Sequence, residues 1–228
     1  MKSRLNTLLF AGVALLTGCA TQQTPVAMST QAFGATATSY GVLMTTVPAV
    51  DTYFPGASCL LCYAAASVAN SDLTKHTKTL PVDELTKLDK QVGDALRKRG
   101  ATVTMVPAFD LKTLPDSSRG APAYAKKDFT SLKAKYKIDK LMVVQLTGVG
   151  FLRNYSAYFP TGEPKASVSG SAYIVNLNDN ALEWYKDVAV LRAADGKWDE
   201  PPKYPGLTNA YYQSIELARD EVLKPLVQ

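Results

Sequence analysis

The sequence predicts an α/β (α+β) fold in which a single mixed β-sheet is covered by helices, in the order β-α-β-α-β-β-β-α. Two observations carry this prediction. In the first half of the chain, segments 82–99 and 128–136 space their apolar residues as helices do, and they alternate with β-branched apolar runs. In the second half, three strand-like segments follow one another before a last helical segment. A length of 228 residues suits one such domain.

The start of the chain has the composition of a secretion signal. Lys2 and Arg4 precede an apolar run that is too short to span a bilayer. Residues 16–18, Leu-Thr-Gly, stand directly before Cys19 and resemble the lipobox of bacterial lipoproteins. The resemblance implies a signal peptide over residues 1–18, a diacylglycerol on the Cys19 thiol and an acyl chain such as palmitate on the new amino group. Ala20, and not Asp, follows, which implies transfer to the outer membrane.

Residues 19–38 are expected to form a lipidated, flexible tether. They are rich in Ala, Thr, Gln and Ser and contain no charged side chain. Removal of residues 1–18 takes away two of the 25 Lys and Arg and leaves 23 against 20 Asp and Glu. That small excess, in a protein that faces the periplasm, argues against nucleic acid as a partner.

Residues 39–49 predict the first strand, which ends near Pro48. We place one domain over residues 39–228. Residues 50–79 form an insertion in it, either with a short helix or irregular throughout, and a turn signal, Tyr-Phe-Pro-Gly, lies near the start of this insertion.

The insertion contains Cys59 and Cys62. With Cys19 acylated, these two remain as an even pair in an oxidising compartment, and a small disulfide loop is the leading interpretation. A redox pair, a metal site that would use the nearby His76, and two free buried thiols are the alternatives.

The clearest helix covers residues 82–99 and is followed by Gly100, which predicts a helix exit with positive φ. A strand is expected at 101–106, a Pro/Gly/Ser-rich loop at 107–127, and a second helix capped by Asp128. The apolar stripes of the two helices are Leu85, Leu88, Val92 and Leu96, and Phe129, Leu132 and Tyr136.

The second half of the chain is dominated by strands. Residues 140–151 begin with a continuous apolar run, which indicates a central strand buried on both faces. Strands 166–177 and 182–191 flank an Asn-Asp-Asn sequence that suits a tight hairpin turn. A last helix is expected to be capped by Thr208 and ended by Pro225.

The loop after the central strand holds Arg153, Tyr155, Tyr158 and Phe159. Exposed aromatic residues beside Arg are typical anchors of protein interfaces, so these four form a possible partner surface. The alternative is that the rings fold back on the sheet.

Residues 39–226 resemble the α/β domain shared by several envelope lipoproteins, among them the curli-secretion lipoprotein, the activators of penicillin-binding proteins, the Pel polysaccharide export lipoprotein and the amino-terminal domain of TolB. The helix exit at 96–100, the strand start at 138–144 and the hairpin that begins at 170–177 and continues to Trp184 carry the resemblance. It implies a mixed sheet in one domain, and it implies no particular activity.

Motifs for catalysis and metal binding are not found. One His in the whole chain disfavours chemistry that needs two imidazoles, and His76 lies in a Lys/Thr-rich stretch that suggests a solvated loop. The spacing of Asn176, Asn178 and Asn180 is that of a calcium loop, but Ala181 and Asp187 stand where the loop needs Gly and Glu. We therefore expect no catalytic residue, no metal and no cofactor apart from the lipid.

These observations lead to one leading hypothesis. The protein is expected to be a non-enzymatic lipoprotein, held in the outer membrane and facing the periplasm, that acts through protein contacts in envelope assembly, export or cell-wall synthesis. The alternatives are an oligomeric subunit of an export complex and a thiol-redox protein that uses Cys59 and Cys62.

Overall fold

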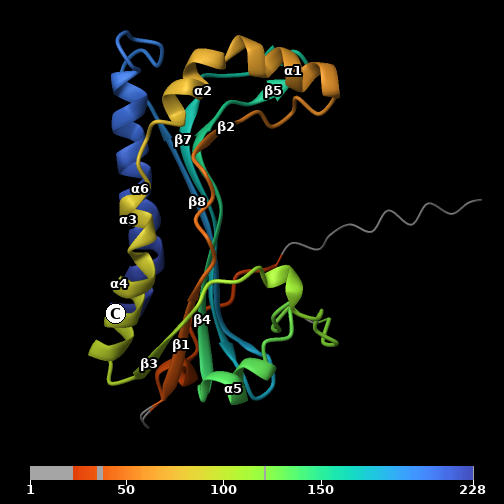
Figure 1. Ribbon diagram of the computed structural model, residues 1–228, viewed down its shortest axis with the longest axis vertical. Helices are drawn as coiled ribbons and strands as arrows, with labels where there is room; N and C mark the ends of the chain where they lie inside the picture. Colours follow the sequence, from red (N-terminus) through yellow and green to blue (C-terminus); the bar gives the residue numbers. More distant parts are fainter. Residues whose placement is uncertain (1–22, 35–37, 121, 228) are drawn as a thin grey trace, which may run out of the picture.

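A computed structural model describes residues 23–34, 38–120 and 122–227. Its main sheet has the strand order β3-β1-β4-β7-β8, with β2 also paired to β4 (Figure 1). Strands β1, β2 and β3 run parallel to their neighbours, and β4, β7 and β8 form an antiparallel meander. The strands are β1 Ser39–Met44, β2 Asp51–Tyr53, β3 Thr102–Val106, β4 Lys140–Leu152, β5 Tyr155–Ser156, β6 Phe159–Pro160, β7 Lys165–Asn176 and β8 Leu182–Ala193.

The helices are α1 Leu60–Ala69, α2 Ser71–Thr77, α3 Asp83–Thr86, α4 Leu88–Lys98, α5 Ser131–Tyr136 and α6 Pro205–Val227, with single 3-10 turns η1 Thr30–Phe33 and η2 Leu111–Thr113. The predicted mixed α/β class is thus confirmed. The structure adds β2, the two short strands of the β5-β6 hairpin, and two helices inside the expected insertion.

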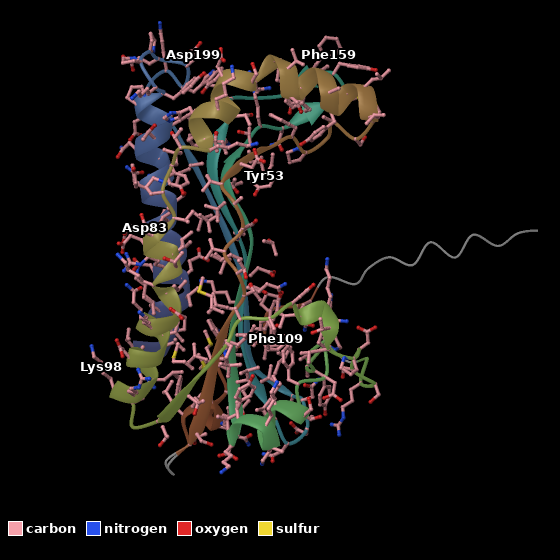
Figure 2. All side chains as sticks on the ribbon, in the orientation of Figure 1. Tyr53, Asp83, Lys98, Phe109, Phe159 and Asp199 are labelled. Carbon is pink, nitrogen blue, oxygen red and sulfur yellow. A yellow bond between two sulfur atoms is a disulfide. The ribbon has the colours of Figure 1, made fainter. Side chains whose placement is uncertain are left out.

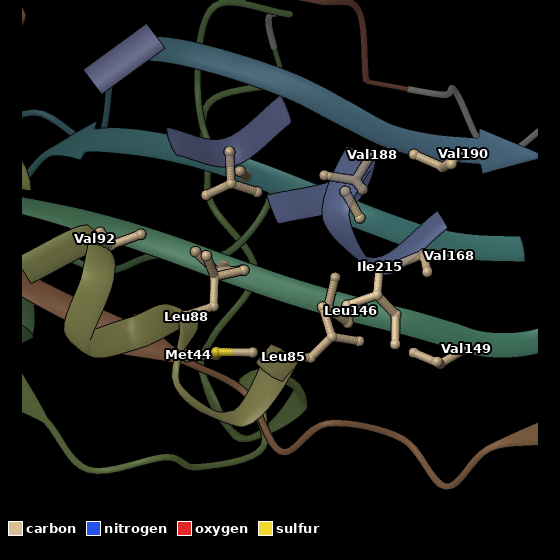
Figure 3. Packing of buried hydrophobic residues seen from close by; sticks show 14 of the residues in the cluster. Met44, Leu85, Leu88, Val92, Leu146, Val149, Val168, Val188, Val190 and Ile215 are labelled. Carbon is tan, nitrogen blue, oxygen red and sulfur yellow. The ribbon is translucent and has the colours of Figure 1, made fainter. Parts of the chain in front are cut away.

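The sheet packs on two hydrophobic clusters, one on each face. The larger cluster lies beneath α4 and α6 (Figure 3), and the smaller one beneath α5 and the loop around η2. Strand β4 divides its apolar run between them, because Leu141 and Val143 face the smaller cluster while Met142 and Val144 face the larger one. All four side chains are fully buried, which confirms the predicted central strand.

Several predicted boundaries are wrong. The predicted first strand, 39–49, ends at Met44. The predicted helix 82–99 divides into α3 and α4 at Lys87, where the Thr86 hydroxyl bonds the Asp83 carbonyl at 2.8 Å. Such a bond competes with the regular helical ladder and bends helices. Asp128 does not cap α5. The N-cap is Thr130, and the Asp128 carboxylate accepts hydrogen bonds from the amide and hydroxyl of Thr130 in the turn that precedes the helix.

The last helix also differs from its prediction. It starts at Pro205, which needs no N–H partner at the first helical position, so Thr208 lies inside the helix and does not cap it. It continues through Pro225 to Val227, because Leu226 is fully buried and holds the final turn against the sheet. The expected helix exit at Gly100 is confirmed, with φ at 85°.

The expected tether is not free over its described part. Val26 exchanges two backbone hydrogen bonds with Tyr185 of β8, and Ala32 of η1 is fully buried. The tether prediction is therefore wrong for residues 23–34, whose few apolar side chains are enough to pack the segment on the domain. Cys19 and the expected signal peptide lie outside the described residues.

A buried ion pair lies beneath this segment. Lys140 Nζ is 2.6 Å from Glu183 Oε2, and both side chains are almost fully buried. Lys140 also donates to the Gln31 carbonyl, and Asn176 donates to Glu183 Oε1 at 2.9 Å. The pair therefore ties η1 to β4 and β8 and leaves neither charge uncompensated.

Candidate interaction surfaces

One end of the sheet carries a projection, which we call the arm: residues 54–77 together with the hairpin 155–160. Figure 1 shows α1 and β5 extending from the sheet on the side opposite α4 and α6, while α2 lies at the end of the sheet beside α6. The arm has a small hydrophobic cluster of its own, formed by Phe54, Ala57, Cys62, Ala66 and Tyr155. Within α1 itself, only one stripe, Cys62 and Ala66, is buried.

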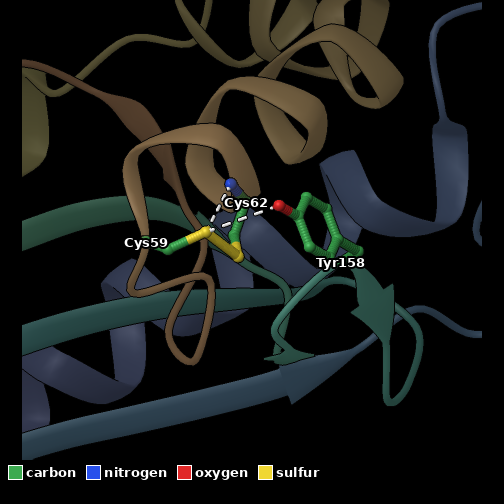
Figure 4. Close-up of a disulfide and its surroundings, with 3 residues drawn as sticks. All are labelled: Cys59, Cys62 and Tyr158. Carbon is green, nitrogen blue, oxygen red and sulfur yellow. Dashed lines mark hydrogen bonds between the residues drawn. A yellow bond between two sulfur atoms is a disulfide. The ribbon is translucent and has the colours of Figure 1, made fainter.

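The end of the arm is closed by a disulfide between Cys59 and Cys62 (Figure 4). Cys59 is the N-cap of α1, and its Sγ accepts a hydrogen bond from the Cys62 amide at 2.9 Å. The Tyr158 hydroxyl lies 3.8 Å from the same sulfur and can only be the donor, because a disulfide sulfur carries no hydrogen. The predicted disulfide is thus confirmed, and the contact of Tyr158 with Cys59 joins the start of α1 to the β5-β6 hairpin.

The four residues of the predicted partner surface divide into two pairs. Tyr155 is buried, and its hydroxyl accepts from Asn70 Nδ2 at 2.7 Å. Arg153 donates to Asn70 Oδ1 at 2.8 Å and lies 4.8 Å above the Trp198 ring. Tyr158 and Phe159 are exposed. Arg153 thus fastens the arm to the end of β4, Tyr155 packs inside the arm, and only Tyr158 and Phe159 are available to a partner.

The outer surface of the arm is apolar. Between Asp51 and Asp72 the chain has no charged residue, yet most of α1 faces outward. Leu60 is 86% exposed, and Phe159, on the hairpin beside it, is 75% exposed (Figure 2). We call this set the arm patch; its members are Leu60, Leu61, Tyr63, Val68, Tyr158 and Phe159. Soluble monomers rarely leave so many large apolar side chains uncovered in one place.

A second surface follows the outer edge of β8. The N–H and C=O of Tyr185 point away from β7 and bond to Val26. Because alternate residues of a strand direct their backbone groups to the same side, the N–H and C=O groups of Asp187, Ala189 and Leu191 also point away from β7. Within the described residues, these groups have no backbone partner. Leu191 is 53% exposed. We call residues 187–193 the edge strip.

A third feature is the lobe formed by residues 107–137, which holds η2 and α5. A pocket of about 360 Å³ opens between this lobe and the sheet, and Gln23, Phe129, Tyr173 and Tyr185 are among its lining residues. Burial, together with a hydrogen bond to Asp187, raises the pKa of Tyr185 to about 12. The phenol therefore stays protonated at neutral pH and serves as a hydrogen-bond donor, not as a base.

His76 is not the solvated loop residue that its sequence context suggests. It lies on α2, 2.8 Å from the Thr208 hydroxyl, and its ring is tilted against Tyr204. Desolvation, and then the charge of Lys203, lower its pKa. In the described part of the chain, no group of three or more His, Cys, Asp or Glu side chains could hold a metal ion.

Sequence reasoning missed the edge strip, the buried Lys140–Glu183 pair and the packing of residues 23–34. The sequence did contain a signal for the arm patch. Residues 52–71 are twenty residues without a charge, and they lie in the expected insertion, outside the predicted elements of the sheet. The edge strip had only a weak signal: Lys186, Asp187 and Arg192 put charges on β8, as edge strands often do, but local sequence does not show which strand ends the sheet.

Comparison with known proteins identifies no family. No family model matches the chain, and no curated protein matches it. Similar solved structures include a PelC dodecamer from Paraburkholderia phytofirmans (13% identity, 83% of this chain and 87% of that one, TM-score 0.35). Protein XCC0632 from Xanthomonas campestris, assigned to DUF330, is 11% identical over 90% of this chain and 93% of that one, with a TM-score of 0.39.

Lipoprotein GNA1162 from Neisseria meningitidis is 12% identical over 78% of this chain and 94% of that one, with a TM-score of 0.30. At these identities and TM-scores, nothing about the function of this chain follows from the likeness. Among the described residues, no helix combines the length and the apolar character that a membrane span requires.

Proposed function

We propose that the chain is a non-enzymatic lipoprotein of the outer membrane that faces the periplasm and binds another protein through the edge strip. The lipobox-like residues before Cys19 support the anchor. The observation that carries the binding role is the row of backbone N–H and C=O groups on β8 that has no partner within the described residues. An unpaired edge strand is a template for a strand from another chain.

The chemistry of the edge strip defines the partner. Seven strand residues span roughly 23 Å, which is room for an extended segment of similar length. Val188 and Val190 point into the core, while Ala189 and Leu191 are exposed and can contact the incoming strand. The partner is therefore an extended polypeptide whose backbone pairs with β8 and whose alternate side chains include apolar ones.

The anchor and the edge strip are tested separately. Cys19→Ala should release the protein from the membrane fraction of fractionated cells, and unchanged membrane retention would contradict the anchor. For the edge strip, a photoreactive residue in place of Leu191 should crosslink to a partner in intact cells. The same residue in place of Leu217, which is 39% exposed on α6, is the control position.

Ala189→Pro sharpens this test. The Ala189 N–H points outward, so proline removes a donor that the fold does not use and an edge strand tolerates it. Crosslinking through position 191 should fall at least tenfold in Ala189→Pro and remain in Ala189→Ser, with both proteins folded by circular dichroism. Equal crosslinking in both variants would overturn the edge strip as the binding surface.

Self-assembly is a second candidate, because antiparallel pairing lets the same edge of two copies meet about a two-fold axis. Light scattering of the detergent-extracted, lipidated protein, coupled to size exclusion, distinguishes the candidates. A dimer or larger assembly that Ala189→Pro dissociates supports self-pairing, and a monomer excludes it under those conditions.

A thiol-redox role is the third candidate. Cys59 is exposed at the start of α1, Cys62 is buried, and an amide N–H points at Cys59 Sγ, which would favour its thiolate after reduction. A structural disulfide should have a reduction potential below about −300 mV, whereas a catalytic one should lie well above it. Equilibration with glutathione buffers measures this difference.

A further inference from the structure

The arm patch, the start of the described chain and the lobe 107–137 face the same side of the molecule. In Figure 1 the arm and the lobe both extend away from the face that α4 and α6 cover. Gln23 lines the lobe pocket together with Phe129 and Tyr173, which belong to the cluster on the face opposite those helices. The chain therefore leaves toward Cys19 on the side from which the arm projects.

We propose that the tip of the arm and the lobe rest on the surface of the lipid bilayer, so that the domain has a fixed orientation on its membrane. This inference rests on the lipid anchor of the proposed function and adds to it a second contact. The tip is formed by the exposed side chains of Leu60 and Leu61, which lie between the two cysteines, and of Tyr158 and Phe159, of which Tyr158 contacts Cys59.

The reach of the anchor supports the bilayer as the occupant. Three residues lie between Cys19 and Gln23, and the four steps from one to the other cover at most about 14 Å in an extended chain. A lipid on Cys19 thus holds the lobe close to the headgroups whatever path these residues take. The arm patch then faces a bilayer at very high effective concentration, which no freely diffusing partner matches.

The charges agree with this placement. Residues 107–137 contain seven Lys or Arg against three Asp. The acidic groups are already engaged, since Asp116 pairs with Lys127 and both Asp110 and Asp128 accept backbone hydrogen bonds. The lobe that borders the anchor is therefore basic, and basic groups near a membrane are attracted to anionic headgroups. The tip has no charge that would oppose insertion.

The tip is also built to enter an interface without rearrangement. The disulfide, the Tyr158 contact and the cluster around Phe54 hold it in one shape. The Arg153–Asn70 bond and the Thr52–Thr77 hydroxyl pair, 3.0 Å apart, fasten the base of the arm. The tip carries Leu and Phe side chains with Tyr beside them. Such side chains are enriched at the boundary between lipid headgroups and acyl chains.

The test uses the lipidated protein in vesicles of phosphatidylethanolamine and phosphatidylglycerol, three to one, that contain brominated acyl chains. Phe159→Trp places a fluorophore at the tip, and Leu217→Trp places one on α6 as a matched control. The native tryptophans, Trp184, which is buried, and Trp198, which is partly buried, give the background, and the wild-type protein in the same vesicles measures it. Bromine should quench at least half of the added emission at position 159 and leave that at position 217 nearly unchanged. Leu60→Ser combined with Leu61→Ser should reduce the quenching at position 159.

The outcomes separate the two proposals. If the protein does not float with the vesicles, the lipid anchor itself is wrong, and with it the proposed function. If it floats but the tryptophan at position 159 is quenched no more than the one at position 217, the membrane contact is wrong. A dimer in detergent that shields the tryptophan at position 159 would then assign the arm patch to a second copy. Equal quenching in phosphatidylcholine vesicles would overturn the part assigned to the basic lobe.

Discussion

The body of the sheet and the arm use apolar residues in opposite ways. At the lobe end, β4 is covered on both faces, and Leu141, Met142 and Val143 are fully buried. In the arm, α1 buries one stripe and exposes Leu60 and Leu61. The same composition thus stabilises the fold in one region and forms an available surface in the other. The difference shows that exposure, not hydrophobicity, indicates where this protein makes contacts.

The largest expected effect lies in the body, at the buried ion pair. Lys140→Met leaves Glu183 without its counter-charge and should cost about 3–5 kcal/mol of unfolding free energy. Urea denaturation followed by circular dichroism measures it. Adding Glu183→Leu should recover much of the loss, since a well-packed apolar pair can replace an ion pair. A loss below about 1 kcal/mol in the single variant would show that the pair is solvated.

The matching change in the arm is removal of its disulfide. Replacing Cys59 and Cys62 together by Ser should cost about 2 kcal/mol, since the closed loop is very short. The loss should be local. Hydrogen exchange should speed up in residues 60–77 and stay unchanged in β4, whereas uniform acceleration would show that arm and body unfold as one unit.

A backbone change tests the exit of α4. Gly100 has φ at 85°, and no atom lies within 4 Å of the position a Cβ would take, so the whole cost of Gly100→Val is conformational. We expect a loss of about 1–2 kcal/mol and a lower melting temperature. Gly120→Val, which also has open space but no positive φ, is the control and should change little. Equal melting temperatures for both variants would contradict the assigned cause.

The smallest effect should come from the contact between arm and body at His76. Desolvation, followed by the charge of Lys203, lowers the pKa of His76 below its ordinary value of 6.5. The unfolded chain therefore binds the proton more readily, so the stabilisation is present above pH 6.5 and is lost as the pH falls through the lowered folded pKa. As the pH falls from 7 to 5, the melting temperature of the wild type should decrease, and that of His76→Gln should decrease less. Parallel curves would contradict the prediction.

The fold was largely predictable because its signals are local. The continuous apolar run of 141–144, the Asn-Asp-Asn turn and the stripe of Leu88, Val92 and Leu96 each require one kind of element. The boundaries of the elements were less predictable. Thr208 is a residue type that often caps helices, and only the structure shows that the last helix begins at Pro205, three residues earlier. Of the four residues predicted as a partner surface, Tyr158 and Phe159 are exposed and Tyr155 is not, because alternation in a short hairpin does not show which face packs against α1.

The sequence by itself predicted the order of the principal strands and helices, a disulfide between Cys59 and Cys62 as the leading interpretation, and a lipid at Cys19, because each depends on neighbouring residues or on a short motif. Only the tertiary structure decided that residues 23–34 pack on β8, that the outer edge of β8 stays open, and that α1 stands clear of the core. Burial and pairing depend on what the rest of the chain brings alongside, and contacts between distant segments leave no pattern within either segment alone.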